Sequence, residues 1–267
     1  MIPNILSIAG SDPSGGAGIQ ADLKTFSALG CYGMAALTAL TAQNTCGVTG
    51  VHVPPAAFVA AQIEAIFADV RVDAVKIGML ADPEIVTAVA DCLARHKPAH
   101  IVLDPVLVAT SGDSLGAPGV VDAMRARLFP LATLITPNLP EAATLAGAPE
   151  ATDVEGLERL AALLHRQGAR AVLVKGGHLS GAMAEDVLFA DGAVSRFCAP
   201  RVATINTHGT GCTLSSAIAA HLAQGLALEA AIRAAKDYLT EALRAGDRLD
   251  VGHGHGPVHH FARLWPQ

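Results

Sequence analysis

The chain has 267 residues, of which 51% are hydrophobic, and its formal net charge is -6. Its 18 Lys and Arg residues are scattered and 4% of residues are aromatic, which disfavours the basic stripe and stacking rings of a nucleic-acid surface. The five cysteines form no CxxC pair, so we expect reduced thiols in the cytoplasm rather than disulfides or a zinc-thiolate site. Neither a signal peptide nor a run of about 18 apolar residues is found, so no membrane span is expected.

Short apolar runs alternate with helical segments along the chain. The runs predicted to be strands are 4–9, 51–53, 74–77, 100–103, 133–135 and 171–174, followed by a hairpin of 186–190 and 194–197. The segments with helical periodicity are 19–29, 58–67, 83–93, 154–164, 212–224 and 228–245. This alternation favours an α/β fold whose mostly parallel sheet is covered on both faces. Because no linker or repeat divides the chain, we expect residues 1–267 to form one domain.

Two of the helix starts carry sequence signals for capping. Asp82 before Pro83 is a good N-cap followed by a proline at the first helical position. Thr152 and Glu155 have the spacing of a capping box, which predicts the start of the next helix. Gly168 supplies the stop of that helix.

The first candidate ligand loop, residues 10–18, joins a strand to a helix with the sequence GSDPSGGAG. Parallel α/β sheets bind ligands at the carboxyl ends of their strands, where glycines let the backbone approach a ligand closely. The loop lacks both GxGxxG spacing and a Gly-Lys-Ser/Thr ending, so neither a Rossmann nor a Walker loop is predicted. The alternative is a tight turn that only lets the helix pack close to the sheet.

The second candidate loop, residues 206–213, reads NTHGTGCT and directly precedes a long apolar helix. Glycines free N–H groups at a helix N-terminus, where the helix dipole favours an anion such as a transferring phosphoryl group. Cys212 lies in the first turn, where we expect the dipole to lower the pKa of its thiol. The alternative is a capped helix that buries a small cysteine.

The third candidate loop, residues 136–141, reads TPNLPE. Asn138 and Glu141 lie on one side of a helical turn, and with Asp104 they offer the oxygen ligands that Mg²⁺ prefers. The alternative is an ordinary capping pair, with Asn138 as the N-cap. Lys175, in the stretch KGGH of residues 175–178, either neutralises phosphate charge or is an exposed lysine at a strand end.

Four histidines lie near the C-terminus, at positions 253, 255, 259 and 260. They lack both ligand spacing and supporting carboxylates, which favours a polar loop at the sheet edge over a metal site.

The order of these motifs resembles that of the hydroxymethylpyrimidine and hydroxymethylpyrimidine-phosphate kinases of thiamine biosynthesis, a branch of the ribokinase-like superfamily. The matching stretches are 8–25, 41–45, 76–80, 103–106, 136–141, 175–178, 206–213 and 256–260. The stretches 8–25 and 206–213 are together highly specific. The resemblance covers residues 4–261 and implies a three-layer α/β/α sandwich, an ATP-dependent kinase that uses Mg²⁺, and a homodimer.

The resemblance also assigns roles to residues of this chain. Those implied to bind the pyrimidine are Gly10, Gln43, Met79 and Val106. Those implied to hold the nucleotide are Asn138, Lys175 and Thr210, and those implied to organise Mg²⁺ are Asp104 and Glu141. Those implied to form the catalytic anion hole are Gly209, Gly211 and Cys212. The Gln43 amide carries a donor and an acceptor, which match the ring nitrogen and amine of an aminopyrimidine.

Cys212 occupies the position where most ribokinase-like sugar kinases have an aspartate base. A thiolate there could accept the hydroxyl proton of the substrate, and we favour this reading slightly over a thiol that only shapes the anion hole. Phosphoryl transfer itself needs little help from a base. The alternatives to the pyrimidine kinase are a pyridoxal kinase on the same scaffold and, less favoured, a non-catalytic nucleotide-binding regulator.

Overall fold

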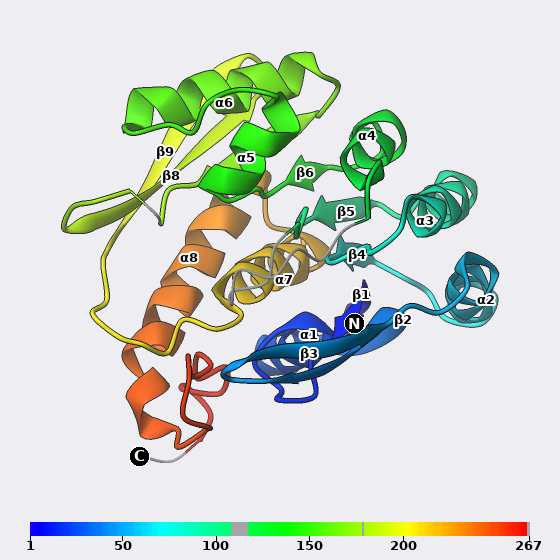
Figure 1. The fold of residues 1–267 in the computed structure, drawn as a ribbon, viewed down its shortest axis with the longest axis horizontal. Coiled ribbons are helices and arrows are strands. Elements are labelled where there is room, and N and C mark those ends of the chain that lie inside the picture. Colours follow the sequence, from blue (N-terminus) through cyan, green and yellow to red (C-terminus); the bar gives the residue numbers. More distant parts are fainter. Residues whose placement is uncertain (108–116, 178, 266–267) are drawn as a thin grey trace.

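The structure is a computed structural model, and it describes residues 1–107, 117–177 and 179–265. In these residues nine strands form one sheet in the order β3-β2-β1-β4-β5-β6-β7-β8-β9 (Figure 1). The strands are β1 (Asn4–Ser11), β2 (Tyr32–Asn44), β3 (Gly47–His52), β4 (Ala74–Ile77), β5 (His100–Leu103), β6 (Leu134–Ile135), β7 (Ala171–Lys175), β8 (Met183–Ala190) and β9 (Ala193–Pro200). Neighbours between β2 and β7 run parallel, whereas β3, β8 and β9 pair antiparallel, so the predicted mostly parallel sheet is confirmed.

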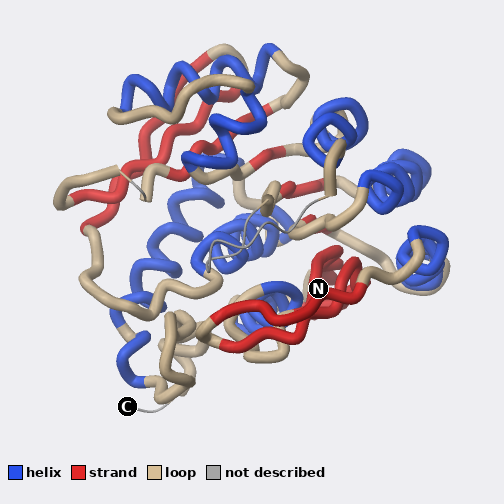
Figure 2. Tube along the Cα trace, in the orientation of Figure 1, coloured by secondary structure: helices blue, strands red, loops and turns tan. Residues whose placement is uncertain are grey.

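Helices cover both faces of the sheet, which confirms the three-layer α/β/α sandwich (Figures 1 and 2). One layer consists of α1 (Gly18–Ala28), α7 (Thr210–Ala223) and α8 (Leu228–Arg244), followed by the short turn η2 (Gly246–Arg248). The other layer consists of α2 (Ala56–Phe67), α3 (Pro83–His96), α4 (Val120–Ala123), the π-turn η1 (Met124–Leu128), α5 (Leu139–Ala146) and α6 (Val154–Arg166). Within the described ranges, no helix combines the length and apolar character needed to cross a membrane.

The sheet separates two hydrophobic cores, because successive strand side chains point to opposite faces. In β1, Leu6 and Ile8 belong to the core beneath α2, α3, α5 and α6, whereas Ile5 belongs to the core beneath α1, α7 and α8. All three side chains are fully buried. Burial on both faces explains why the central strands read as continuous apolar runs.

Most predicted elements are confirmed, but α4, η1 and α5 were not predicted, and the predicted strand 51–53 only overlaps the end of β3. The predicted strands 74–77 and 100–103 coincide with β4 and β5, and the Asp82 side chain accepts the predicted capping bond from Glu84 N at 2.7 Å. The prediction of Thr152 as a cap was wrong: Asp153 is the N-cap of α6 and accepts from Gly156 N at 2.7 Å. The long strand β2 was not predicted, because its small residues show no alternation of apolar and polar side chains.

Candidate active site

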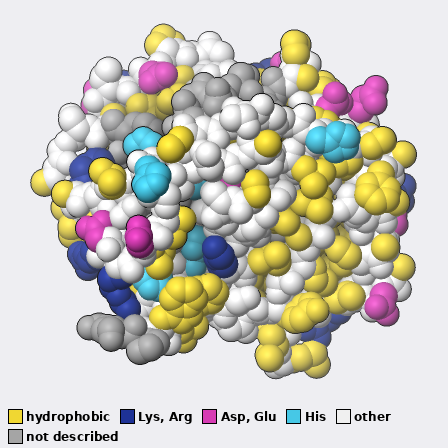
Figure 3. All heavy atoms as spheres, turned by 60° about the horizontal axis from the view of Figure 1, so that its bottom comes forward, with side chains coloured by type: hydrophobic (Ala, Val, Ile, Leu, Met, Phe, Trp, Pro, Cys, Tyr) yellow, Lys and Arg dark blue, Asp and Glu magenta, His cyan; other side chains and the backbone are white. Residues whose placement is uncertain are grey.

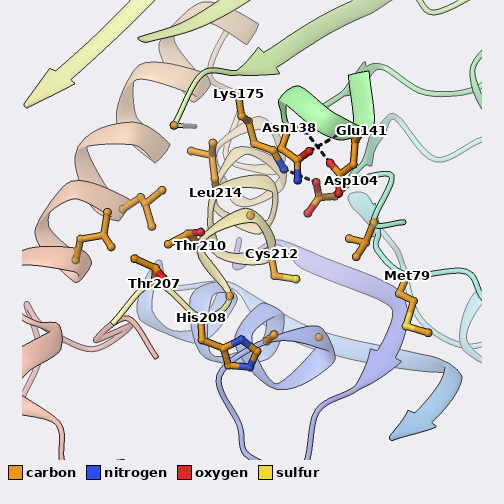
Figure 4. A pocket seen from close by; sticks show the side chains of 18 of the residues that line it. Met79, Asp104, Asn138, Glu141, Lys175, Thr207, His208, Thr210, Cys212 and Leu214 are labelled. Atoms are coloured by element: carbon orange, nitrogen blue, oxygen red, sulfur yellow. Dashed lines mark hydrogen bonds and ion pairs between the residues drawn. The ribbon is translucent and has the colours of Figure 1, made fainter. Parts of the chain in front are cut away.

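A pocket of about 660 Å³ lies at the carboxyl ends of the parallel strands (Figure 4). Its volume is in the range of small-ligand sites, roughly 300 to 1,000 Å³. All twelve predicted site residues line it: Gly10, Gln43, Met79, Asp104, Val106, Asn138, Glu141, Lys175, Gly209, Thr210, Gly211 and Cys212. Figure 4 shows Met79 to the right of Cys212, whereas the group of Lys175 and Asp104 lies above it. The pocket therefore has two ends that meet at the start of α7.

Two glycines lie at the start of α7, and Gly209 tolerates no side chain without rearrangement. Gly209 is the N-cap with φ 77°, and a Cβ there would lie 1.8 Å from Gly16 O. A Cβ on Gly211 would approach Lys175 Nζ to 3.2 Å. The first N–H groups of a helix lack intrahelical acceptors, so this bare backbone end offers donors to an anion in the pocket.

Lys175 and Asp104 form a buried ion pair at the phosphate end of the pocket. Lys175 Nζ lies 2.7 Å from Asp104 Oδ1, which also accepts from Thr136 Oγ1 at 3.2 Å. Burial alone would raise the pKa of Asp104, but Lys175 and the more distant Lys76 hold it below its usual range. Lys175 is thus a buried cation, and the alternative of an exposed strand-end lysine was wrong.

Asn138 and Glu141 form the capping box of α5, so the structural alternative for this pair is confirmed. Asn138 Oδ1 accepts from Glu141 N at 2.9 Å, and Glu141 Oε2 accepts from Asn138 N at 2.7 Å. Glu141 is nevertheless buried at the pocket wall. Its burial raises its pKa to about 7, an effect that Lys175 opposes and Asp104 reinforces. Glu141 is therefore both a capping residue and a carboxylate of the pocket wall that interacts with Asp104.

The opposite end of the pocket is apolar. Met79 packs with Ala39 and Val106, and a Cβ on Gly10 would lie 3.2 Å from Met79 Sδ. The pairing register shifts next to Gly10 and next to Gln43, because β2 has an extra residue, Thr38, opposite β1 and β3 has an extra residue, Thr49, opposite β2. Gln43 Oε1 accepts from Thr41 Oγ1 at 3.1 Å. This end offers a flat apolar slot with one amide at its rim.

The expected lowering of the Cys212 pKa by the helix dipole was wrong. Burial raises the pKa of the thiol to about 11, and the carboxylates of Asp22 and Asp104 add to this, while Lys76 opposes it. The sulfur accepts a hydrogen bond from Gly18 N. At neutral pH the group is therefore a thiol, and a resting thiolate base is not supported.

Two buried pairs of polar side chains beside the pocket, one of them an ion pair, were not among the predicted site residues. Lys76 Nζ lies 2.8 and 2.9 Å from the two oxygens of Asp22, and both side chains are fully buried. Asp22 also accepts from Ser7 and Ser216. These partners are far apart in sequence, and an isolated Asp or Lys in an apolar stretch carries no motif that would have predicted the pair.

The second pair joins two of the candidate loops. His208 Nε2 lies 2.7 Å from Asp12 Oδ2, and both residues are buried. The same aspartate accepts from Ser14 N at 2.9 Å and from Ala17 N at 2.9 Å. These bonds hold the pKa of Asp12 at about 2 although burial opposes them. The pair ties the glycine loop 10–18 to the loop 206–213.

The C-terminal histidines divide into two groups. His253 and His255 are exposed, whereas His259 and His260 are buried, so only the first pair belongs to a polar loop as predicted. Within residues 1–107, 117–177 and 179–265, no group of three or more His, Cys, Asp and Glu side chains is placed to hold a metal ion. His178, part of the predicted stretch 175–178, lies outside the described residues.

Comparison with known proteins shows the family and the fold of the chain. A family profile described as phosphomethylpyrimidine kinase matches residues 12–259. The hydroxymethylpyrimidine/phosphomethylpyrimidine kinase of Salmonella typhimurium is 55% identical over 263 residues, which cover 98% of either chain. The solved structure of an ADP complex of Bacillus subtilis pyridoxal kinase matches with a TM-score of 0.91 and 38% identity, covering 99% of this chain and 100% of that one.

A phosphomethylpyrimidine kinase structure from Clostridium difficile matches with a TM-score of 0.80 and 43% identity, covering 90% of this chain and 99% of that one. Both sequence and structure thus point to kinases with a ribokinase-like fold. The chain is a phosphotransferase that belongs to the phosphomethylpyrimidine kinase family.

Proposed function

We propose that the protein transfers the γ-phosphoryl group of ATP to 4-amino-5-hydroxymethyl-2-methylpyrimidine and then to the resulting monophosphate, in thiamine biosynthesis. The observation that carries the proposal is the two-ended pocket. An apolar slot with the Gln43 amide suits an aminopyrimidine ring, and Lys175 beside the start of α7 suits nucleotide phosphates. The names of the bacterial relatives support both acceptors, and the ADP complex of the Bacillus kinase supports the nucleotide.

In the proposed reaction the acceptor oxygen bonds to the γ-phosphorus while the bond to the β,γ-bridging oxygen breaks and ADP leaves with the electron pair. The transferring group spreads its charge over three oxygens. The N–H groups of Gly211 and Cys212 and the ammonium of Lys175 lie where they can stabilise that charge. The hydroxyl proton is lost to a phosphoryl oxygen or to water, because the Cys212 thiol is already protonated.

The carboxylates of Asp104 and Glu141 fit a divalent cation held together with nucleotide phosphates. Mg²⁺ commonly takes one or two protein carboxylates and completes its shell with water and phosphate oxygens. The raised pKa of Glu141 reflects burial and a nearby carboxylate, a cost that a bound cation would offset. When bound, the metal would neutralise phosphate charge, and Asn138 and Thr210 would complete the polar wall around the phosphates.

A direct assay tests this proposal. The purified protein is incubated with ATP and Mg²⁺ and with the pyrimidine alcohol, its monophosphate or pyridoxal, and the products are identified by mass spectrometry. We expect conversion of both pyrimidines, with the alcohol reaching the diphosphate. If neither pyrimidine is phosphorylated, the proposal is wrong.

Pyridoxal kinase is the second candidate, because the Bacillus pyridoxal kinase has the same fold over the whole chain. Pyridoxal also presents a hydroxymethyl group on an aromatic ring. The pyrimidine is favoured because Gln43 offers a donor and an acceptor that match its amine and ring nitrogen. The ratio of kcat/KM for the two alcohols, measured in the same assay, decides between them.

We also propose that one domain, residues 1–267, works as a cytoplasmic homodimer. All five cysteines are free, which fits a reducing compartment. Hydrophobic side chains gather at the lower right of the face shown in Figure 3. Two side chains near this edge of the sheet, Val51 on β3 and Phe58 on α2, are exposed, and β3 is an edge strand.

A second copy of the chain would cover both this surface and the edge of β3. Light scattering should give twice the chain mass, and Phe58→Arg should reduce it to the mass of one chain. An unaltered mass in Phe58→Arg would place the interface elsewhere, and a monomeric wild type would exclude the dimer.

A further inference from the structure

The segment that follows α8 contacts both the turn between β2 and β3 and the loop 206–213. We call residues 252–257 the strap. At one end of the strap, Gly254 N donates to Thr45 Oγ1 at 3.1 Å and His255 N donates to Thr45 O at 3.1 Å. Thr45 forms the turn between β2 and β3, two residues after Gln43. The strap therefore holds the turn of the hairpin that carries the acceptor amide.

Only glycine fits the strap where it crosses this turn. A Cβ on Gly254 would lie 2.0 Å from Thr45 O, and a Cβ on Gly252, which has φ +72°, would lie 2.2 Å from Thr45 Oγ1. Real Cβ atoms do not approach backbone oxygens so closely, so a side chain at Gly254 must push the strap and the turn apart. The two segments are fitted backbone against backbone.

The other end of the strap reaches the loop that forms the anion hole. Gly256 O accepts from His208 N at 3.0 Å, and a Cβ on Gly256 would lie 1.9 Å from Asn206 Oδ1. Beyond the strap the chain is anchored to α8, where Tyr238 Oη donates to His260 O at 2.7 Å. The strap is thus a fixed bridge between the hairpin and the start of α7.

Little else fixes Gln43 from this side. A small cavity of about 210 Å³ lies beside this contact and is lined by Gln43, His208 and His255, among others. The Gln43 side chain has no packing on the side of this cavity, so its place depends on the hairpin itself, through the backbone and through the bond that Gln43 Oε1 accepts from Thr41 Oγ1. Small displacements of a group that positions a substrate cost large factors in rate or affinity.

We propose that the strap is a specificity-determining element: by fixing the hairpin relative to the anion hole, it places the Gln43 amide where it selects an aminopyrimidine. This inference rests on the proposed pyrimidine kinase function. The strap touches no substrate, and its residues act through Gln43. Selection arises because an amide at the correct place pairs with the amine and ring nitrogen of the pyrimidine, whereas the pyridine ring of pyridoxal gains less from it.

The first test is Gly254→Ala, with Gly50→Ala as the matched control. Gly50 lies in the same hairpin, but a Cβ there would meet Ala42 Cβ at an ordinary 3.6 Å. We expect Gly254→Ala to raise KM for the pyrimidine alcohol about tenfold and to change KM for ATP less than twofold. The kcat/KM preference for the pyrimidine over pyridoxal should fall by a similar factor. Gly50→Ala should change none of these values.

The second test asks whether the effect passes through Gln43. In a Gln43→Ala background, Gly254→Ala should have little further effect on the pyrimidine KM, because the group that the strap positions is gone. Additive effects, or equal increases of KM for ATP and for the pyrimidine, would overturn the proposal. If Gly254→Ala does not fold, Thr45→Ala is used instead, because it removes the side-chain bond to Gly254 N. It should raise KM for the pyrimidine alcohol by a smaller factor and leave KM for ATP nearly unchanged. If the wild type does not phosphorylate the pyrimidine at all, the proposed function fails instead.

Discussion

At the scale of single residues, the charge states in the pocket decide what chemistry it can perform. Cys212 lies at the helix end where an anion is favoured, yet burial and two carboxylates outweigh that advantage. The thiol is therefore better suited to fill space beside the acceptor than to remove a proton. Positioning and charge stabilisation suffice for a loose phosphoryl transfer.

The pKa of Cys212 gives a prediction for pH dependence. The thiolate is the reactive form, so with a pKa of about 11 only about 0.1% of the thiol is ionised at pH 8. Alkylation by iodoacetamide should rise about tenfold per pH unit from pH 8 to 10. The activity should show no matching rise, and Cys212→Ser should keep activity within about tenfold. The exposed Cys46 and Cys198 are first replaced by serine, and a shared midpoint of alkylation and activity near pH 7 would restore the base reading.

Glu141 gives a second prediction, because its capping and metal-binding readings differ in outcome. If it organises Mg²⁺, Glu141→Gln should raise the Mg²⁺ concentration needed for half activity about tenfold or more and lower kcat. If it is only a cap, the variant should lose about 1 kcal/mol of stability and turn over normally. A Mg²⁺ titration and a melting curve on one sample separate the two.

The buried pair of Lys76 and Asp22 gives a third prediction. Removing one partner leaves an uncompensated charge, so Lys76→Met should lower the free energy of unfolding by about 3–5 kcal/mol. The double variant Lys76→Met/Asp22→Asn removes both charges and should recover most of that loss. Urea unfolding of Lys76→Met, of Asp22→Asn and of the double variant measures the coupling free energy between the two residues. Additive losses would mean that the pair does not stabilise the fold as a pair.

At the scale of elements, the helices and parallel strands with clear periodicity were predictable from the sequence. So was the hairpin of β8 and β9, because Asp191 and Gly192 supply the turn with positive φ. β2 was not predictable from pattern, since its alternation is obscured by small residues. Within the pocket, the glycines and strand-end side chains were predictable, whereas the pair of Asp12 and His208 depends on tertiary contacts that no local motif reports.

The start of α6 gives a prediction at this scale. Asp153 caps the helix and also lies 3.6 Å from Arg159, an exposed pair that adds little. Asp153→Ala should therefore lower the free energy of unfolding by about 1 kcal/mol. Thr152→Ala, the neighbouring control, should stay within about 0.5 kcal/mol of the wild type. Urea unfolding of both variants checks the assignment, and a larger loss for Thr152→Ala would contradict it.

At the scale of the whole molecule, two strands of one sheet bring cations to a single pocket. Lys175 from β7 serves the phosphate end, and Lys76 from β4 lies beneath Cys212 at its middle. Each lysine is paired with an aspartate, so neither is an isolated buried charge. A monophosphate acceptor carries about two negative charges at neutral pH, so the second proposed transfer brings anionic groups together from both sides.

The Cys212 thiol is neutral, so it adds no repulsion to these anionic groups. Asp22 and Asp104 already place negative charge near position 212. A carboxylate at that position would add a third negative charge. This charge would repel the monophosphate by several kcal/mol at short range and reduced dielectric. The pyrimidine alcohol is neutral and escapes this repulsion. A negative charge on the side chain at position 212 would therefore slow the transfer to the monophosphate more than the transfer to the alcohol.

The resulting prediction concerns Cys212→Asp. This variant should keep part of the first step and lose the second disproportionately, by about tenfold or more in the ratio of the two kcat/KM values. Each step is measured separately, by giving the protein the alcohol or the monophosphate with excess ATP. Cys212→Asn is the control, because it has the shape of aspartate without its charge and should slow both steps by similar factors. If Cys212→Asp also slows both steps equally, the loss is steric, and the neutrality of the thiol does not explain the tolerance of a phosphorylated acceptor.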